Sequence, residues 1–98
     1  MRLRFTGPAL ADLDSIFEYI VARSPSGSRR VQARIKAVVD LLRMHPLIGT
    51  KTDDPVIRRM TTAPYPYSVF YEVGHDEIIV HAVRHDARDP SGMPGSGA

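Results

Sequence analysis

Two amphipathic segments separated by a very short break constrain the fold of this chain more than any other feature. Each has apolar side chains three or four positions apart, the spacing of one helical face: Leu10, Leu13, Phe17 and Ile20 in residues 9–24, and Val31, Ile35, Val38 and Leu42 in residues 28–45. Thr6 can cap the first helix, Pro25 disfavours helical geometry at Ser24, Gly27 allows the chain to reverse, and Pro46 ends the second helix. Two helices joined so closely form an antiparallel hairpin, whose apolar stripe needs a sheet to cover it.

The remaining segments supply the strands of that sheet. Residues 1–5 alternate basic and apolar side chains, and residues 56–61, 67–73 and 77–85 have the length and composition of strands. Residues 46–55 are predicted to form a loop because of their Pro, Gly and Asp content. Strict alternation places Ile79, His81, Val83 and His85 on one face of the last strand, opposite Ile78, Val80, Ala82 and Arg84. The predicted fold class is α+β, in the order β-α-α-β-β-β.

The length of 98 residues predicts a single domain, which we assign to residues 1–90. Residues 91–98 (SGMPGSGA) contain little that can pack and are predicted to be a flexible tail. With no cysteine and no histidine pair at ligand spacing, the sequence predicts neither a disulfide nor a metal site, and no cofactor. No apolar run approaches the roughly 20 residues that span a bilayer, and the N-terminus lacks a signal-peptide core. A cytoplasmic protein is therefore predicted.

Charge is distributed unevenly between the two helices. The first contains the acidic residues Asp12, Asp14 and Glu18 and no basic residue up to Ile20. The second contains one acidic residue, Asp40, and five basic residues: Arg29, Arg30, Arg34, Lys36 and Arg43. The sequence pI of about 9.3 permits nucleic acid or an acidic protein as partner and requires neither.

Several motifs along the chain together resemble those of the RelE/ParE superfamily, the toxins of bacterial type II toxin–antitoxin pairs. They are ALADLDSIFEYI (9–20), MHPLIG (44–49), IRRM (57–60), PYPYSVFYEV (64–73) and VHAVRHDARDP (80–90). The pieces YPYSVFY and RHDARDP are closer to the ParE branch. The resemblance implies an antiparallel sheet with the helical hairpin on one face, and a groove that takes segments of a cognate antitoxin, ParD-like or another small acidic protein. The basic second helix is then either a solvated face or a rim for an acidic antitoxin tail.

The two branches of the superfamily differ in target. RelE-like toxins are messenger-RNA ribonucleases that act in the ribosome, whereas ParE-like toxins are associated with poisoning DNA gyrase. Metal-free RNA cleavage needs a general base, cations for the phosphate and a general acid. The strand YSVFYEV contains no cation, where the RelE-like branch usually supplies an arginine. The resemblance therefore favours a gyrase-binding toxin; a ribosome-dependent endoribonuclease is the alternative, and a degenerate member that retains only antitoxin binding and co-repression is a third possibility.

The candidate site residues follow from these hypotheses. A ribonuclease would use Arg58 and Arg59 for phosphate, Arg84 for charge stabilisation, and His85 or Tyr71 for proton transfer. A toxin that acts by binding would present a larger set to its target or partner: Arg58, Arg59, Tyr65, Tyr67, Arg84, His85 and Arg88. Structural roles compete with both, because tyrosines beside prolines stack naturally on a sheet and Arg58 and Arg59 must point to opposite faces of their strand.

Overall fold

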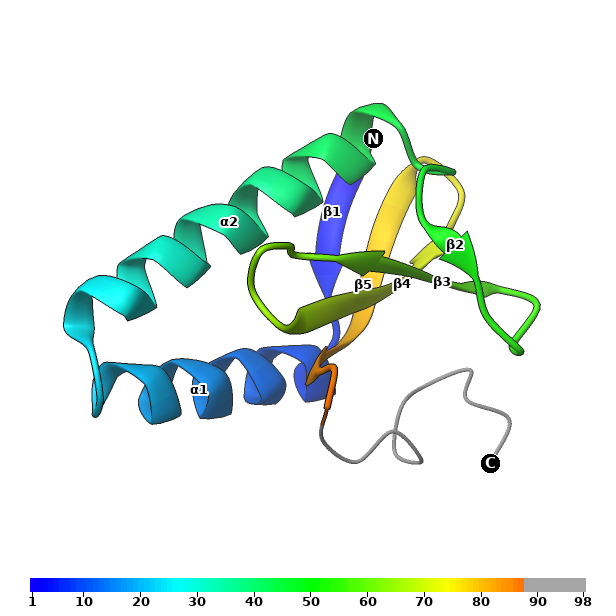
Figure 1. Cartoon of the computed structure of the whole chain (residues 1–98). Helices are drawn as coiled ribbons and strands as arrows, with labels where there is room; N and C mark the ends of the chain where they lie inside the picture. The colour runs from blue at the N-terminus through cyan, green and yellow to red at the C-terminus, as the bar shows by residue number, and fades with distance from the viewer. Residues whose placement is uncertain (88–98) are drawn as a thin grey trace.

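The two predicted helices lie against a five-stranded sheet, and the computed structural model describes residues 1–87 (Figure 1). The elements are β1 (Arg2–Phe5), α1 (Gly7–Val21), α2 (Pro25–Met44), β2 (Thr50–Lys51), β3 (Ile57–Thr61), β4 (Tyr67–Val73) and β5 (Glu77–His85). The predicted α+β class and the order of the long elements are confirmed. Arg88 and the predicted tail lie outside the described residues.

Serine and proline, rather than glycine, determine where the helical hairpin turns. Ser24 has an extended backbone and its Oγ accepts a hydrogen bond from Gly27 N at 3.0 Å, so it caps a helix that already begins at Pro25. The predicted start of α2 at residue 28 was wrong, and Gly27 lies in its first turn. Thr6 caps α1 as predicted, accepting from Ala9 N at 3.2 Å. From this short link the helices diverge as a V (Figure 1).

The sheet is mixed, with the strand order β1-β5-β4-β3-β2. Strands β2 to β5 run antiparallel to their neighbours, but β1 pairs with β5 in parallel, from Arg2 opposite Glu77 to Phe5 opposite Val80. The resemblance implied a wholly antiparallel sheet, and this expectation was wrong at the β1 edge. A parallel pair needs a long connection, and nearly the whole chain separates these two strands. At the other edge, part of the predicted loop forms the two-residue strand β2, opposite Arg58 and Arg59.

A β-bulge in β5 changes which side chains face the helices. Phe70 lies opposite Ala82 and Tyr71 opposite Val80, so His81 is the extra residue. Val80 and Val83 consequently both join the helix-facing core, and the strict alternation predicted for β5 was wrong beyond Val80. The helix-facing core contains residues of both helices and of β4 and β5: Ala9, Val31, Ile35, Val38, Val39, Leu42, Tyr67, Val69, Tyr71, Ile78, Val80 and Val83. Ile57, Phe70 and Ala82 form a smaller cluster on the other face.

Helix α1 satisfies the edge of β5 beyond the end of β1. The Val83 amide donates to Asp12 Oδ2 at 3.0 Å, and Thr6 Oγ1 donates to the His81 carbonyl at 3.4 Å. Arg84 Nε also lies 3.5 Å from the same Asp12 oxygen. An open strand edge leaves amides without partners, so Asp12 both closes the edge and joins α1 to the sheet.

Replacing Asp12 with alanine is expected to lower the free energy of unfolding by about 1–3 kcal/mol, because the amide of the buried residue Val83 loses its acceptor. For a domain of this size each kcal/mol corresponds to roughly 4–8 °C in Tm, which thermal unfolding followed by circular dichroism would measure. Asp14→Ala is the matched control, because it removes the same charge from an exposed position on the same helix. Equal melting of the two variants would contradict this role for Asp12.

Neither described helix is long and apolar enough to cross a membrane.

Candidate functional site

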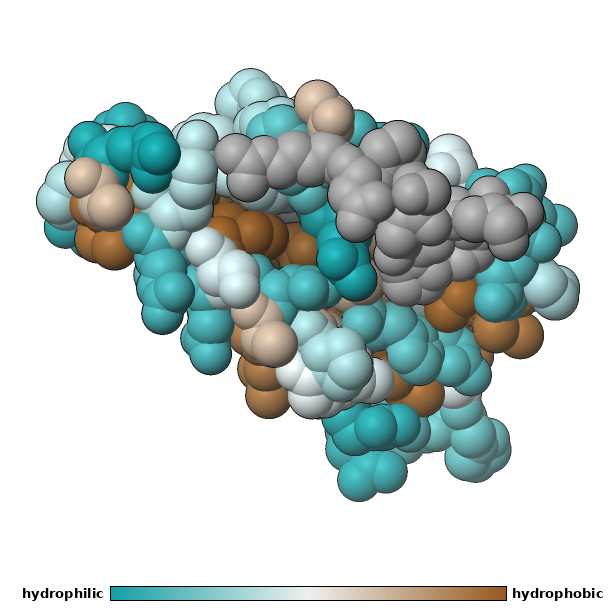
Figure 2. Space-filling view, turned by 90° about the horizontal axis from the view of Figure 1, so that it is seen from below, coloured by the Kyte–Doolittle hydropathy of each residue, from teal (hydrophilic) through white to brown (hydrophobic). Residues whose placement is uncertain are grey.

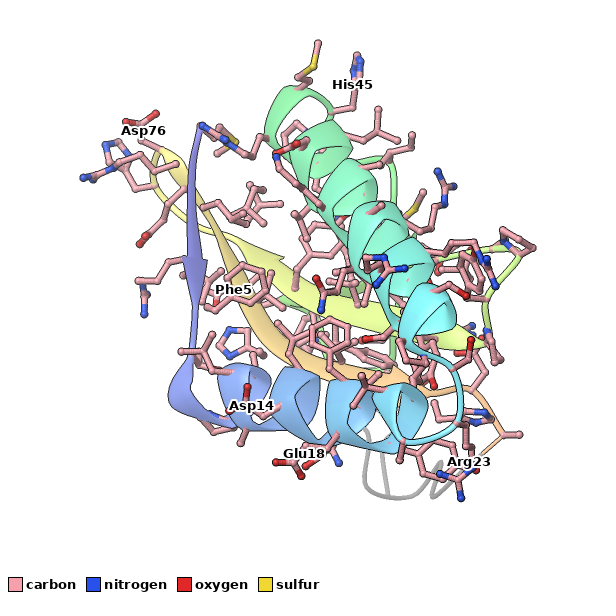
Figure 3. The ribbon with its side chains drawn as sticks, turned by 90° about the vertical axis from the view of Figure 1, so that its left-hand side faces the viewer. Phe5, Asp14, Glu18, Arg23, His45 and Asp76 are labelled. Carbon is pink, nitrogen blue, oxygen red and sulfur yellow. The ribbon has the colours of Figure 1, made fainter. Side chains whose placement is uncertain are left out.

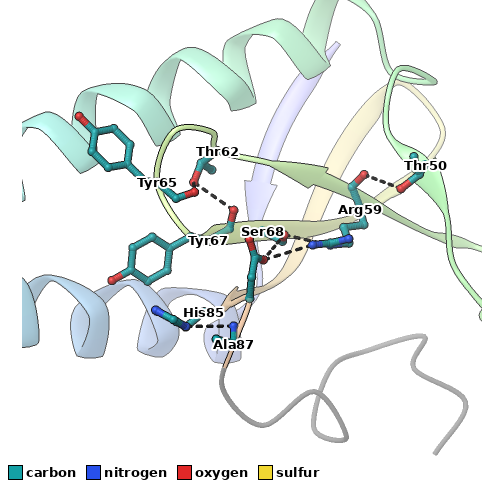
Figure 4. Close-up of polar contacts among 9 residues, drawn as sticks. Thr50, Arg59, Thr62, Tyr65, Tyr67, Ser68, His85 and Ala87 are labelled. Atoms are coloured by element: carbon teal, nitrogen blue, oxygen red, sulfur yellow. Dashed lines mark hydrogen bonds and ion pairs between the residues drawn. The ribbon is translucent and has the colours of Figure 1, made fainter.

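Arg59 belongs to a polar network on the sheet face away from the helices. Its Nε donates to Ser68 Oγ at 2.9 Å and its Nη2 lies 3.3 Å from Asp86 Oδ1, while Ser68 Oγ donates to the same carboxylate oxygen at 2.5 Å (Figure 4). Ser68 is fully buried, and Arg84 lies directly opposite it on β5. The network holds the chain that follows β5 against β3 and β4, and it occupies the guanidinium of Arg59.

The tyrosines that precede and begin β4 pack against the helix-facing core. Tyr67 is buried and its ring meets that of His85 edge to face, with centroids 5.3 Å apart. His85 Nδ1 also accepts a hydrogen bond from the Ala87 amide at 3.1 Å, so the ring is held on two sides (Figure 4). Tyr65 is half-buried against the same core. The geometry of both tyrosines favours packing over base stacking.

Tyr71 and Arg58 hold the loop that follows α2. The Tyr71 side chain is fully buried; its hydroxyl donates to the Pro46 carbonyl at 2.7 Å and accepts from the Gly49 amide at 3.0 Å. Arg58 Nη1 donates to the carbonyls of Gly49 at 2.9 Å and Leu47 at 3.3 Å. Burial raises the pKa of Tyr71 above its ordinary value of 10.0, partly offset by the Gly49 amide and the Arg58 charge.

The candidate ribonuclease residues do not converge on one surface. Tyr71 and His85 face the helices, whereas Arg59 belongs to the network on the opposite face. His85 lies opposite Tyr67, four residues along β4 from Tyr71, so roughly 13 Å of strand separates the backbone positions of the two proposed proton-transfer residues. The Tyr71 hydroxyl is also buried and bonded to Pro46 and Gly49, whereas a general acid or base must lie within hydrogen-bond reach of its proton.

A groove lies between the diverging helices and β1, where Figure 3 shows Phe5 beneath the opening of the V. Its volume is about 660 Å³ and its apolar lining comes from β1 and both helices: Leu3, Phe5, Leu13, Phe17, Ile35 and Val39. The α2 side adds Arg29, Lys36 and Arg43, seven residues apart and therefore in one row along the helix. Lys36 and Arg43 both lie near Asp40, at 2.9 and 3.8 Å, whereas no ion pair is recorded for Arg29 within residues 1–87.

Sequence reasoning considered the basic residues of α2 only as a possible rim for an acidic antitoxin tail, and it assigned no site role to the apolar residues of the groove or to Asp86. Phe17 has the spacing of a core residue, so its partial exposure could not be seen in the pattern; the row of cations at seven-residue spacing was the available signal. Asp86 lies inside the RHDARDP motif, but nothing local indicates that it meets Ser68, 18 residues away. Glu72 and His81 form a further pair, Oε1 to Nε2 at 2.8 Å, which the β5 bulge creates.

Within residues 1–87 no group of three or more His, Cys, Asp and Glu side chains is placed to hold a metal ion. Viewed from the side on which α1 lies, hydrophilic residues cover most of the surface and apolar residues show between them as separate areas (Figure 2).

Comparison with known proteins gives a consistent result. The family model for the ParE toxin of the type II toxin–antitoxin system parDE matches residues 3–90. The chain is 36% identical over 79 residues to "Putative toxin Y4kP" of Sinorhizobium fredii, covering 81% of this chain and 82% of that protein. It is 33% identical over 84 residues to "Toxin RelE2" of Caulobacter vibrioides, covering 86% and 93%. A solved structure of the chromosomal ParDE system from P. aeruginosa superposes with a TM-score of 0.76 at 26% identity, covering 87% of this chain and 95% of the other.

Proposed function

This chain belongs to the ParE toxin family of type II toxin–antitoxin systems, and from that membership we propose that it arrests growth by binding DNA gyrase and that a cognate antitoxin neutralises it. The observation that carries the choice of binding over catalysis is the dispersal of the candidate catalytic groups. Tyr71 and His85 lie far apart on one face of the sheet, and Arg59 is ion-paired on the other.

The groove supports the antitoxin part of the proposal. Its apolar lining fits one face of an amphipathic helix, and its row of cations on α2 fits carboxylates along one flank of that helix. The acidic antitoxin predicted from the resemblance has this chemistry. Of the two roles predicted for the basic residues of α2, the groove favours the antitoxin rim for Arg29, Lys36 and Arg43.

A ribosome-dependent endoribonuclease is the second candidate, and the name of the relative "Toxin RelE2" favours it. The strand β4 supports the gyrase proposal instead, because its outward side chains are Ser68, Phe70 and Glu72 and none is a cation. Arg58 donates to two backbone carbonyls, so it is also held away from a phosphate.

Expression without the antitoxin is expected to arrest growth through DNA damage, because a poisoned gyrase leaves broken DNA. We expect induction of the SOS response first, with protein synthesis continuing in pulse-labelling, and inhibition of supercoiling by purified gyrase when purified toxin is added. A catalytically inactive gyrase and heat-unfolded toxin are the controls. An immediate collapse of protein synthesis with cleaved messages and no SOS response would assign the chain to the ribonuclease branch.

A further inference from the structure

An exposed apolar patch lies where α2 ends and the chain turns toward β2. It consists of Leu41, Met44, Pro46, Leu47 and Ile48, which line a shallow hollow of about 700 Å³. Met44 is 74% exposed, Leu47 65% and Ile48 48%. Three large apolar side chains exposed together on a small protein are typical of an interaction surface, whereas scattered ones are ordinary.

The backbone of this patch is held rigidly from beneath. The buried Tyr71 hydroxyl bridges Pro46 and Gly49, and Arg58 donates to the carbonyls of Leu47 and Gly49. A Cβ on Gly49 would lie 2.5 Å from the Tyr71 hydroxyl oxygen, so this close approach requires glycine. A loop fixed in this way loses little conformational freedom on binding, which favours affinity.

The patch and the groove lie on different sides of α2. The α2 residues that line the groove include Arg29, Lys36, Val39 and Arg43, whereas Leu41 and Met44 line the patch. At 100° per residue, Leu41 points about 160° away from Val39. His45, at the end of α2, points away from the body of the protein in Figure 3. A single helix bound in the groove would therefore leave the patch accessible.

The charges beside the patch indicate what kind of partner fits it. The exposed Lys51 follows Ile48 in β2 with no ion pair recorded among the described residues, whereas Arg43, which precedes Met44, lies on the groove side of α2 at 3.8 Å from Asp40. Two copies of this chain meeting through the patch would bring the two Lys51 ammonium groups toward each other, because a two-fold contact opposes a surface to itself. A partner with an apolar centre and carboxylates around it is complementary.

We propose that this patch is the surface by which the toxin docks on its target protein, and that it engages an apolar pocket bordered by acidic residues on gyrase. The inference rests on the proposed function and adds the location and chemistry of the contact. Tyr71 and Arg58 are positioning residues for this surface, since they hold the backbone that presents Met44, Leu47 and Ile48.

The test is the double variant Met44→Ser/Leu47→Ser, in which exposed side chains change and the buried supports remain. We expect binding to purified gyrase to weaken by about 30-fold or more, the effect of removing a hot spot, with growth arrest lost at matched soluble levels. Affinity for the antitoxin and Tm should stay unchanged. Leu10→Ser/Val21→Ser is the matched control, since it removes two comparably exposed apolar residues from α1 and should keep full toxicity. Lys51→Glu should weaken gyrase binding severalfold without touching an apolar side chain.

Each alternative occupant predicts a different result. Full toxicity of the folded double variant would overturn the inference, and so would full toxicity of Lys51→Glu if the double variant does not fold. In either case, inhibition of gyrase by the wild-type toxin would leave the proposed function intact. A loss of antitoxin affinity equal to the loss of gyrase affinity would assign the patch to the antitoxin. A wild-type dimer in sedimentation that dissociates in the double variant would assign it to a second copy. If the wild-type toxin does not bind gyrase, the proposed function fails. In that case, loss of growth arrest in the double variant, with the wild type still toxic, would locate docking on a different target at the patch.

Discussion

Replacing Tyr71 with alanine is expected to remove about 3–5 kcal/mol of stability, the usual effect of truncating a buried aromatic residue. That is a large fraction of the roughly 5–15 kcal/mol that stabilises a domain, so much of the variant should be unfolded at 37 °C. Tyr71→Phe keeps the ring but leaves Pro46 O and Gly49 N without their partner, at an expected loss of about 1–3 kcal/mol. Urea unfolding of the three proteins measures both effects.

The Tyr71→Phe variant also isolates a pH effect. Because burial raises the pKa of Tyr71 in the folded state above 10.0, its contribution to stability is complete below that pH and is lost as the pH rises through the folded-state value. The stability of the wild type should therefore fall more steeply above pH 10 than that of Tyr71→Phe. Parallel curves, or a phenylalanine variant as stable as the wild type at neutral pH, would contradict the supporting role assigned to this hydroxyl.

Reversing two charges of the groove is expected to weaken antitoxin binding strongly. In Arg29→Glu/Lys36→Glu, repulsion replaces attraction at two points of the cationic row, so we expect at least a tenfold increase in Kd and a weaker dependence on salt. Free antitoxin at about 1,000 times its Kd stabilises the toxin by roughly 4 kcal/mol, so a smaller rise in Tm on adding antitoxin is a second readout. Calorimetric titration at two salt concentrations measures the first.

The control for this variant is Arg30→Glu/Arg2→Glu, which changes the net charge equally at exposed positions that do not line the groove. It should retain most of the antitoxin affinity. Equal weakening by both double variants would mean that overall charge governs binding rather than the row along α2. Unaltered affinity in the groove variant would locate the antitoxin elsewhere on the molecule.

Local patterns were sufficient to predict the two helices and the four longer strands, but not the features that depend on pairing between strands. The apolar spacing of Leu13, Phe17 and Ile20 and the cap at Thr6 act within one or two turns, so they can be read from neighbouring residues. The bulge at His81 follows from the way β5 pairs with β4, and it turns Val83 rather than Ala82 toward the helices. The parallel pairing of β1 with β5 likewise joins the two ends of the chain, for which no local signal exists.

The candidate site was predictable only as a set of residue types. Arg58, Tyr71, Arg59 and Arg84 were singled out because cations and phenols can serve chemistry. The structure gives these four side chains hydrogen-bonding or ionic partners: two backbone carbonyls for Arg58, Pro46 and Gly49 for Tyr71, Ser68 and Asp86 for Arg59, and Asp12 for Arg84. Arg88 lies outside the described residues, and its binding role stays a prediction.

By itself the sequence determined the two helices, the four longer strands and the superfamily, because helical and strand periodicity, caps and motif order are properties of residues close together in the chain. Only the tertiary structure decided which side chains are used in building the fold and which remain exposed for a partner. Asp12 meets Val83 across 71 positions, and Phe17 is left partly open because α1 and α2 diverge over β1. The physical reason is that burial and pairing depend on neighbours in space, which residues distant in the chain supply.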